Sequence, residues 1–408
     1  MRATSVVVGA LAAFGLGFAP SAAAYDAQSK QWYLTPMQAE KMWKVSTGKG
    51  VKVAVIDSGV NPDTPSLKGQ VLADEVPKSV AYRATDDYSG HGTTMAELIA
   101  GTGSGEGIQG LAPGAKIVPY RVALTGMKGG TEEKEKTPDS WRAIRAAADT
   151  DAKIISMSYG GLLSVKEEEA VKYAASKGKL MIAAVGNAGE SKGRTDYPAA
   201  YPYVIGVSSI DSSSTVSKFS SFGNYVDLAA PGEGFPGWCD SSFRSYCDDK
   251  QGTSPATAIV AASAALIWSA HPTWTVNQVV RSLIDTAGRT WAKDTPSQYL
   301  GYGPVRPRKV LENPHYNAGP AYSDPLAKEN KTDGEGLVTE VSPSPSPSAS
   351  ASAQAPKGTS GGATSAAGSS AESSNDSSKS LWIALGAAAA VIVIGGAGVA
   401  VMRARHAR

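Results

Sequence analysis

Residues that bind metals are scarce in this sequence. Its 408 residues include only two cysteines and four histidines, and none of these lies at a spacing typical of zinc ligands. No acidic loop has the ligand spacing by which a calcium site is recognised. We therefore assign no metal site and expect no cofactor.

An excess of one charge is also absent. The 39 basic and 37 acidic residues leave a formal net charge of +2, and no basic block dominates the sequence. Proteins that bind nucleic acid neutralise phosphates with clustered Lys and Arg. The composition therefore argues against a nucleic-acid partner, while the length allows one large domain or two ordinary ones.

Two long apolar segments lie near the ends of the chain. Residues 1–24 have a basic start, an apolar centre and an Ala-x-Ala close at Ala24, which is typical of a secretory signal peptide. An uncleaved anchor helix is the alternative. The second segment begins at Leu381 and ends at Met402, and its 22 uncharged residues are enough to cross a bilayer once as a helix.

The flanks of this transmembrane helix predict its orientation. Residues 403–408 form a basic tail, which places the C-terminus in the cytoplasm by the positive-inside rule. The body then lies outside a single-pass plasma membrane anchor. Residues 321–380 are rich in Pro, Ser and Ala and are expected to form a disordered linker, because they cannot bury enough apolar surface to fold. Composition does not decide between a spacer and a simple tail.

Residues 25–43 form a short extension, and residues 44–320 form a body in which strand and helix patterns alternate. This alternation predicts an α/β fold of three layers, a mostly parallel sheet flanked by helices on both faces. Such sheets carry their active residues at the carboxyl ends of the strands. We expect strands at 51–56, 116–122, 153–157, 180–185 and 203–207, and helices at 94–99, 139–149, 165–176, 255–270 and 276–286.

Three polar residues stand where such a sheet would bring them together. Asp57 closes an apolar strand, His91 lies between glycines at the start of a helix, and Ser254 begins an alanine-rich helix. Each one alone would be read as a cap or turn residue. Together they form the set that nucleophilic hydrolysis requires, with Ser254 as nucleophile, His91 as general base and then acid, and Asp57 orienting His91.

The oxyanion that forms in such a reaction needs hydrogen-bond donors set in advance. Asn187 follows an apolar strand among glycines and is the candidate side-chain donor. The second candidate is the main-chain N–H of Ser254 at a helix N-terminus. Pro255 has no N–H, which is harmless at the first helical position. The chain order Asp, His, Ser is that of subtilisin.

Four motifs at these residues resemble the signatures of subtilisin-like serine proteases, over about residues 43–286. They are Asp57-Ser58-Gly59, Gly90-His91-Gly92-Thr93, Gly186-Asn187 and Gly252-Thr253-Ser254. The order of segments along the chain further resembles the mycosins, the membrane-anchored subtilases associated with type VII secretion. The resemblance implies a subtilisin-like fold, protein or peptide substrates, and secretion-channel components as partners.

The helix that carries His91 departs from the common pattern of this family. Thr94 stands where many subtilases have a second histidine, and Glu97 stands where a small glycine is usual. Ser254 is followed by Pro-Ala-Thr-Ala rather than Met-Ala-Ala-Pro. No atom of the triad is removed, but a buried Glu97 near His91 would perturb the pKa of the imidazole.

Two further segments resemble the family's substrate-binding residues. Ser158, Tyr159 and Gly160 resemble the edge to which a polypeptide adds as an extended strand through main-chain hydrogen bonds. Asp196 lies in a stretch that resembles the lining of the first specificity pocket, where a carboxylate would favour Lys or Arg before the scissile bond. An Asp196 that points to solvent is the alternative.

Cys239 and Cys247 lie eight residues apart in a chain expected to be exported, which predicts a disulfide close to Ser254. Two free thiols are the alternative.

The polar loop 125–139 is either a solvated connection or a restriction on substrate access. The extension 25–43 is too short for a prodomain, and the mycosin resemblance implies a strap on the body instead.

The sequence as a whole predicts a membrane-anchored extracellular serine endopeptidase. The competing hypothesis is a structural scaffold of a secretion complex that requires little proteolysis. A Ser254→Ala variant discriminates between the two hypotheses. Export that survives this substitution but fails when the whole protein is deleted would indicate a structural role.

Overall fold

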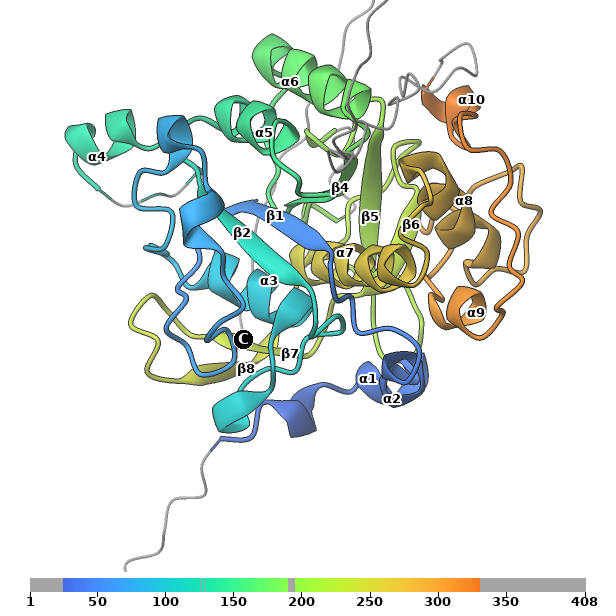
Figure 1. Ribbon diagram of the computed structural model, residues 1–408, viewed down its shortest axis with the longest axis horizontal. Helices are drawn as coiled ribbons and strands as arrows, with labels where there is room; N and C mark the ends of the chain where they lie inside the picture. Colours follow the sequence, from blue (N-terminus) through green and yellow to red (C-terminus); the bar gives the residue numbers. More distant parts are fainter. Residues whose placement is uncertain (1–24, 126, 128, 190–194, 331–408) are drawn as a thin grey trace, which may run out of the picture. The chain divides into compact units, whose positions relative to one another are not determined.

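The computed structural model describes residues 25–125, 127, 129–189 and 195–330 (Figure 1). The chain divides into two compact units, residues 1–343 and residues 344–408, and the second unit lies outside the described residues. The expected signal peptide, the expected transmembrane helix and most of the expected linker also lie outside them.

Six parallel strands form the central sheet of the first unit, in the order β2-β1-β3-β4-β5-β6. Nearly all of their residues are buried, which requires cover on both faces of the sheet. The strands are β1 (Lys52–Asp57), β2 (Lys116–Arg121), β3 (Ile154–Met157), β4 (Leu180–Ala184), β5 (Val204–Ile210) and β6 (Leu228–Pro231).

Alternate side chains of β1 belong to two different hydrophobic cores. Val53 and Val55 join the core that includes α3, α7 and α8, whereas Ala54 and Ile56 join the core that includes α5 and α6. This two-residue alternation confirms the three-layer α/β fold (Figure 1). The helices are α3 (His91–Ala100), α5 (Ser140–Ala148), α6 (Val165–Ser176), α7 (Thr253–Ala270) and α8 (Val276–Thr286).

Helix α7 runs through the first core. In the described part of the chain it has the length and apolar character of a membrane span, but 83% of it is buried inside the protein, as in a core helix. It begins at Thr253, two residues before the predicted start, so Pro255 is its third residue rather than its first. The missing N–H of Pro255 still costs no helical hydrogen bond, because the first four N–H groups of a helix have no partner within it.

Elements without a clear hydrophobic period were not predicted. Strand β6 reads Leu-Ala-Ala-Pro, and the antiparallel pair β7 (Phe235–Trp238) and β8 (Tyr246–Lys250) mixes Pro, Gly and charged residues. Short helices were missed as well: α1 (Leu34–Met37), α2 (Ala39–Trp43), α4 (Thr131–Lys136), α9 (Arg308–Leu311), α10 (Ala327–Asn330) and the 3-10 turns Gln28–Lys30, Ala73–Glu75, Lys78–Val80 and Ser104–Glu106.

The N-terminal extension packs onto the body along its whole described length. Tyr33 is fully buried and stacks on Phe235 with ring centroids 4.6 Å apart. The Trp32 indole donates to the carbonyl of Glu233 at 2.8 Å, and the Trp43 indole donates to the carbonyl of Leu111 at 2.8 Å. Residues 25–43 therefore form a strap whose anchors reach the segment that precedes Ser254.

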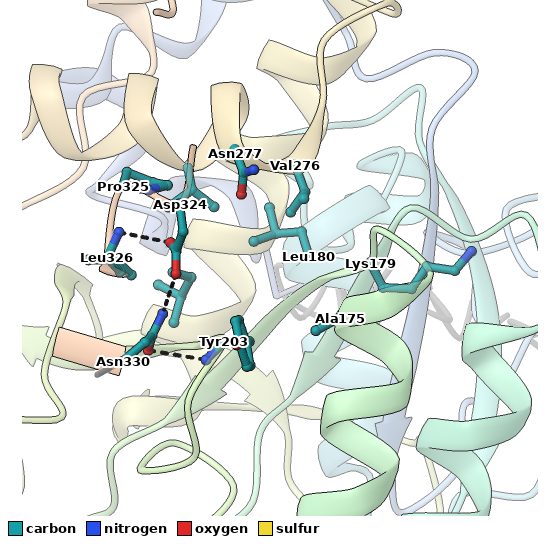
Figure 2. Close-up of a pocket in the computed structure, with 12 residues that line it drawn as sticks. Ala175, Lys179, Leu180, Tyr203, Val276, Asn277, Asp324, Pro325, Leu326 and Asn330 are labelled. Atoms are coloured by element: carbon teal, nitrogen blue, oxygen red, sulfur yellow. Dashed lines mark hydrogen bonds between the residues drawn. The ribbon is translucent and has the colours of Figure 1, made fainter. Parts of the chain in front are cut away.

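A small cavity lies at the amino ends of β4 and β5, the edge of the sheet opposite to the carboxyl ends (Figure 2). Residues 324–330 close it, and Leu326 is buried in the first core. Asn330 accepts from the main-chain N–H of Tyr203 at 3.2 Å and donates to Asp324 at 3.0 Å. The packed part of the chain thus continues past residue 320, to Asn330, the last described residue.

Candidate active site

Asp57 ends β1 at the carboxyl edge of the sheet and is fully buried. One of its carboxylate oxygens, Oδ1, lies 2.8 Å from Nδ1 of His91 and accepts from the main-chain N–H of Ser58 at 2.7 Å. The Ser58 hydroxyl oxygen lies 3.1 Å from the same oxygen and 2.7 Å from Asp87, so its single proton is shared between the two carboxylates. The carboxylate is therefore fixed in place, and it holds the proton of His91 on Nδ1.

His91 is the first residue of α3, and its side chain is 40% exposed. Gly92 lets this helix approach Asp57, since a Cβ there would lie 2.2 Å from the carbonyl oxygen of Gly59. Burial favours the neutral imidazole, but the charge and hydrogen bond of Asp57, with a smaller contribution from Asp87, outweigh it and raise the pKa of His91 above 6.5.

Asp87 was not singled out from the sequence, yet it builds the start of α3. Its carboxylate accepts from the main-chain N–H groups of Gly90 at 2.9 Å and Thr93 at 2.8 Å, and from the hydroxyls of Ser58 and Thr93 at 2.7 Å each. An acid just before an apolar helix is a capping signal. That signal stands in the sequence four residues before His91.

Ser254 is the second residue of α7 and is 8% exposed. Its hydroxyl donates to the carbonyl oxygen of Ser158 at 3.0 Å, and the Ser158 hydroxyl donates back to the carbonyl of Ser254 at 3.2 Å. Among the described residues no hydrogen bond joins Ser254 to His91. Serine hydroxyls turn freely about the Cβ–Oγ bond, and catalytic hydrogen bonds often tighten only when substrate binds.

Asn187 follows β4 and lies against the start of α7. Its Oδ1 accepts from the main-chain N–H of Thr253 at 2.8 Å and from the Thr253 hydroxyl at 3.0 Å. A main-chain N–H can only donate, so this contact fixes which end of the amide is oxygen. The amide nitrogen then faces Gly252, where a Cβ would lie 3.3 Å from it. Its donors are thus aimed at the segment that carries Ser254.

The residues expected to bind substrate follow β3 and β4. The Tyr159 hydroxyl donates to Glu167 at 3.2 Å, so this side chain packs toward α6. In the described chain the main-chain groups of Tyr159 and Gly160 make no hydrogen bond to other main-chain groups, whereas Gly161 pairs with Tyr197. An unpaired stretch of this kind can accept a further strand.

The Asp196 side chain is 4% exposed and does not point to solvent. A Cβ at Gly160 would lie 3.3 Å from its Cγ, and a Cβ at Gly186 would lie 2.0 Å from its Oδ2. The carboxylate therefore lies between the segments that follow β3 and β4. These are the segments that also hold Ser158 and Asn187.

Glu97 is fully buried on α3. Burial raises the pKa of its carboxyl from 4.5 to about 8. At neutral pH the group is therefore mostly uncharged and contributes little charge to the surroundings of His91. The folded state loses stability as the pH rises between these two values, since the unfolded carboxyl releases its proton first.

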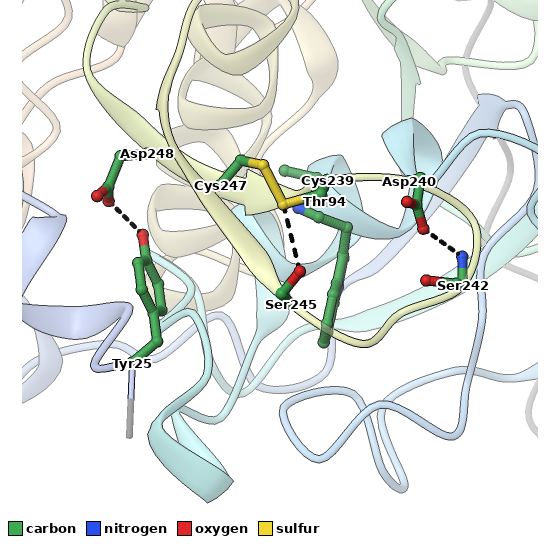
Figure 3. Close-up of a disulfide and its surroundings, with 9 residues drawn as sticks. Tyr25, Thr94, Cys239, Asp240, Ser242, Ser245, Cys247 and Asp248 are labelled. Carbon is green, nitrogen blue, oxygen red and sulfur yellow. Dashed lines mark hydrogen bonds between the residues drawn. A yellow bond between two sulfur atoms is a disulfide. The ribbon is translucent and has the colours of Figure 1, made fainter. Parts of the chain in front are cut away.

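Two further expectations concern the surface around the site. Cys239 and Cys247 form a disulfide that closes the β7–β8 hairpin (Figure 3), so the free-thiol alternative is wrong. The loop 125–139 carries α4, which is largely exposed. Glu133 fastens this loop to the body by accepting from Arg121 at 2.5 Å and from Tyr82 at 3.0 Å.

The structure pairs Asp57 with His91 at the carboxyl edge of a parallel sheet and places Ser254 at the start of the buried helix α7. These parts, in this chain order, are typical of a serine endopeptidase of the subtilisin type. Residues 48–303 match the model of the subtilase family. Thermitase of Thermoactinomyces vulgaris is 34% identical over 289 residues, which cover 66% of this chain and 95% of that protein. The chain belongs to the subtilase family.

Other relatives agree with this assignment. Subtilisin E of Bacillus subtilis is 38% identical over 250 residues, 59% of this chain and 61% of that protein. Among solved structures, MycP1 from Mycobacterium smegmatis matches with a TM-score of 0.58 at 25% identity, over 71% of this chain and 86% of that one. The MycP3 protease from the type VII (ESX-3) secretion system matches with a TM-score of 0.57 at 29% identity, over 70% and 88%. Mycosins are thus among its structural neighbours.

Proposed function

We propose that this protein is a membrane-anchored, extracellular endopeptidase that cleaves its substrates with Asp57, His91 and Ser254. The contact that carries the proposal is the 2.8 Å pair between Asp57 and Nδ1 of His91. It leaves Nε2 free to accept the proton of a serine. The direct test is the hydrolysis of a peptide substrate by the wild-type protein and by a Ser254→Ala variant.

The reaction follows from the positions of these groups. A substrate chain adds as a strand along Ser158–Gly160 and places its scissile carbonyl carbon next to Ser254. The Ser254 oxygen attacks that carbon while Nε2 of His91 takes the hydroxyl proton, and Asp57 stabilises the resulting imidazolium. His91 then gives the proton to the leaving amine, and water hydrolyses the acyl-enzyme by the same steps.

The negative oxygen of the tetrahedral intermediate needs two donors. The Asn187 amide is one, because Thr253 occupies its oxygen end and leaves its N–H groups toward Gly252. The main-chain N–H of Ser254 is the other, at the positive end of α7. Both are in place before the substrate arrives, so they cost no reorganisation in the transition state.

Asn187→Ala is expected to lower kcat by about 10²–10³, with little change in KM, because the lost donor acts on the transition state rather than on the bound substrate. Initial rates on a fluorogenic peptide measure both constants. The exposed Asn224→Ala variant is the control and should keep wild-type kcat. A tenfold rise in KM at constant kcat would place Asn187 in ground-state binding and contradict the oxyanion role.

We expect Asp196 to favour Lys or Arg before the scissile bond. Its buried carboxylate lies between Gly160 and Gly186, next to the residues that would surround that substrate side chain. Asp196→Asn should lower kcat/KM for basic substrates about thirtyfold, for a loss of about 2 kcal/mol. Cleavage of a peptide library measures the preference. Equal use of apolar and basic residues by the wild-type protein would contradict this assignment.

The anchoring and the association with type VII secretion rest on other observations. An apolar segment from Leu381 to Met402, followed by a basic tail, supports a single span with the body outside. The structural likeness to MycP1 and MycP3 supports a role at a secretion channel. A scaffold role at the same channel is the second candidate function, supported by the strap and by the same likeness.

A further inference from the structure

The disulfide-closed hairpin (Phe235–Lys250) is docked onto the helix that carries His91. The main-chain N–H of Trp238 donates to the Thr94 hydroxyl at 3.0 Å, and that hydroxyl donates to the carbonyl of Gly90 at 2.8 Å. Thr94 therefore links strand β7 to the residue that precedes His91. Figure 3 shows Thr94 next to the disulfide.

One turn further along α3, Glu97 binds the other strand of the hairpin. The Tyr246 hydroxyl donates to one of its carboxyl oxygens at 3.0 Å, and the Thr64 hydroxyl donates to the other at 2.8 Å. The Trp238 indole N–H is buried beside the same carboxyl, outside hydrogen-bonding geometry. Positions 94 and 97 lie on one face of a helix, so both strands dock on that face.

The hairpin also touches the surroundings of His91 directly. A Cβ on Gly90 would lie 2.8 Å from the carbonyl oxygen of Asp240 and 3.2 Å from the Cβ of Trp238, so hairpin backbone and α3 are in close contact. At its far end, Lys250 stands two residues before Gly252, the N-cap of α7. One rigid element thus runs from the start of the His91 helix to the start of the Ser254 helix.

Charge connects this element to the imidazole. The groups that act on His91 are Asp57 from β1, Asp87 from the segment before α3, and Lys250 from β8. The two acids raise the pKa of His91, and the ammonium of Lys250 lowers it. The Lys250 side chain lies close to Thr94, because a Cβ on Gly237 would lie 3.0 Å from the Lys250 Cγ and 2.9 Å from the Thr94 Cγ2. The position of the hairpin therefore affects the pH at which His91 becomes a base.

We propose that Thr94 and Glu97 are positioning residues for the proposed proteolysis, holding the hairpin so that Lys250 keeps its place near Thr94 on the His91 helix and Gly252–Ser254 keeps its place at the start of α7. Neither side chain touches substrate. Each acts through the hairpin, which the disulfide Cys239–Cys247 makes stiff enough to transmit its position. This inference rests on the proposed function for its kinetic readout but not for its spectroscopic one.

The test compares variants that keep or remove the docking bonds. Glu97→Ala and Thr94→Val remove them, whereas Glu97→Gln and Thr94→Ser keep a polar partner of similar size. Lys250→Gln removes the charge and leaves the docking bonds in place. The buried Leu283→Ala on α8 is a control that destabilises the fold away from the site. Each variant is assayed for kcat/KM against pH on a fluorogenic peptide, and its His91 imidazole is titrated by NMR.

Glu97→Ala and Thr94→Val are expected to lower kcat/KM about tenfold, as small misplacements of catalytic groups do. Both should also move the acidic limb of the pH profile to higher pH, in the direction of Lys250→Gln. Glu97→Gln and Thr94→Ser should restore both quantities, and Leu283→Ala should leave the limb unchanged. Glu97 does not itself cause this shift, because its own pKa of about 8 keeps it neutral on the acidic limb.

Glu97→Ala and Thr94→Val proteins that keep the wild-type limb and the wild-type His91 titration would overturn the inference. If Glu97→Ala does not fold, the Thr94 pair decides the question alone. If the wild-type protein hydrolyses no peptide, the proposed function fails, and the NMR titration of His91 still tests the positioning. An unchanged imidazole pKa in both variants then overturns it, and a raised pKa supports it.

Discussion

Ser254→Ala is expected to reduce kcat for peptide hydrolysis about 10⁶-fold, the loss that follows when subtilisin loses its serine. The Ser254 hydroxyl lies at the N-terminus of α7 and donates to the carbonyl oxygen of Ser158. Ser158 belongs to the segment along which we expect the substrate strand to bind. Turnover of a fluorogenic peptide and the acylation burst measure the loss. A folded Ser254→Ala protein that retains more than about a hundredth of the activity would contradict the mechanism.

The same variant separates catalysis from scaffolding. The exposed Ser241→Ala variant at the hairpin tip is the control and should behave as wild type. In cells, secretion that survives Ser254→Ala but fails when the gene is deleted assigns the essential role to the scaffold. Secretion that fails in both assigns it to proteolysis. The chemistry of the site is the same in either case.

Asp57→Asn is expected to lower kcat about 10⁴-fold with little effect on KM. The Oδ1 position is shared by His91 and the main-chain N–H of Ser58. An amide nitrogen placed there would oppose the Ser58 N–H and force the proton of His91 onto Nε2. An amide oxygen placed there keeps the tautomer but leaves the imidazolium of the transition state without its counter-charge.

The pH profile provides a second measurement on Asp57→Asn. Because Asp57 raises the pKa of His91 against the effect of burial, its neutralisation should move the acidic limb to lower pH. Asp63→Asn, an exposed acid six residues along the chain, is the matched control and should move neither kcat nor the limb. A limb that moves to higher pH in Asp57→Asn would contradict the assigned role of this carboxylate.

Much of the sheet was predictable because parallel strands buried on both faces read as apolar runs. Strands β1 to β5 therefore lay close to their expected positions, and the three proposed triad residues could be placed at turns between strands and helices. The residues of the hairpin carry no such signal. Phe-Pro-Gly-Trp contains two residues that disfavour strands, and Tyr-Cys-Asp-Asp-Lys has no fully buried residue.

The supporting residues of the site were harder to predict than its central ones. The Asp87 carboxylate accepts from the main-chain N–H of Thr93, and Thr253 donates its main-chain N–H to Asn187. The directions of these N–H groups are set only when the helices form. Glu97 looked like a perturbing charge in sequence, because its hydrogen-bond partner Tyr246 lies 149 residues away. Long-range packing, rather than the local sequence pattern, decides whether such a carboxyl group is charged or neutral.

The extension at the N-terminus shows the same dependence on distant contacts. Its aromatic residues could belong to a loop or to a removable segment when read alone. In the structure, Tyr33 stacks on Phe235, and the Tyr25 hydroxyl donates to Asp248 at 2.5 Å. The strap therefore braces both strands of the hairpin. This placement links residues 25–43 to the stability of the proposed active site.

The most direct test of the central claim is the reaction of the folded wild-type protein with a fluorophosphonate, a reagent that modifies activated serines. We expect one adduct per chain, located on Ser254 by peptide mapping, at neutral pH. The adduct should be absent from Ser254→Ala and should form much more slowly in Asp57→Asn. A folded wild-type protein that forms no adduct, or forms it on another serine, would contradict the assignment of Ser254 as the nucleophile.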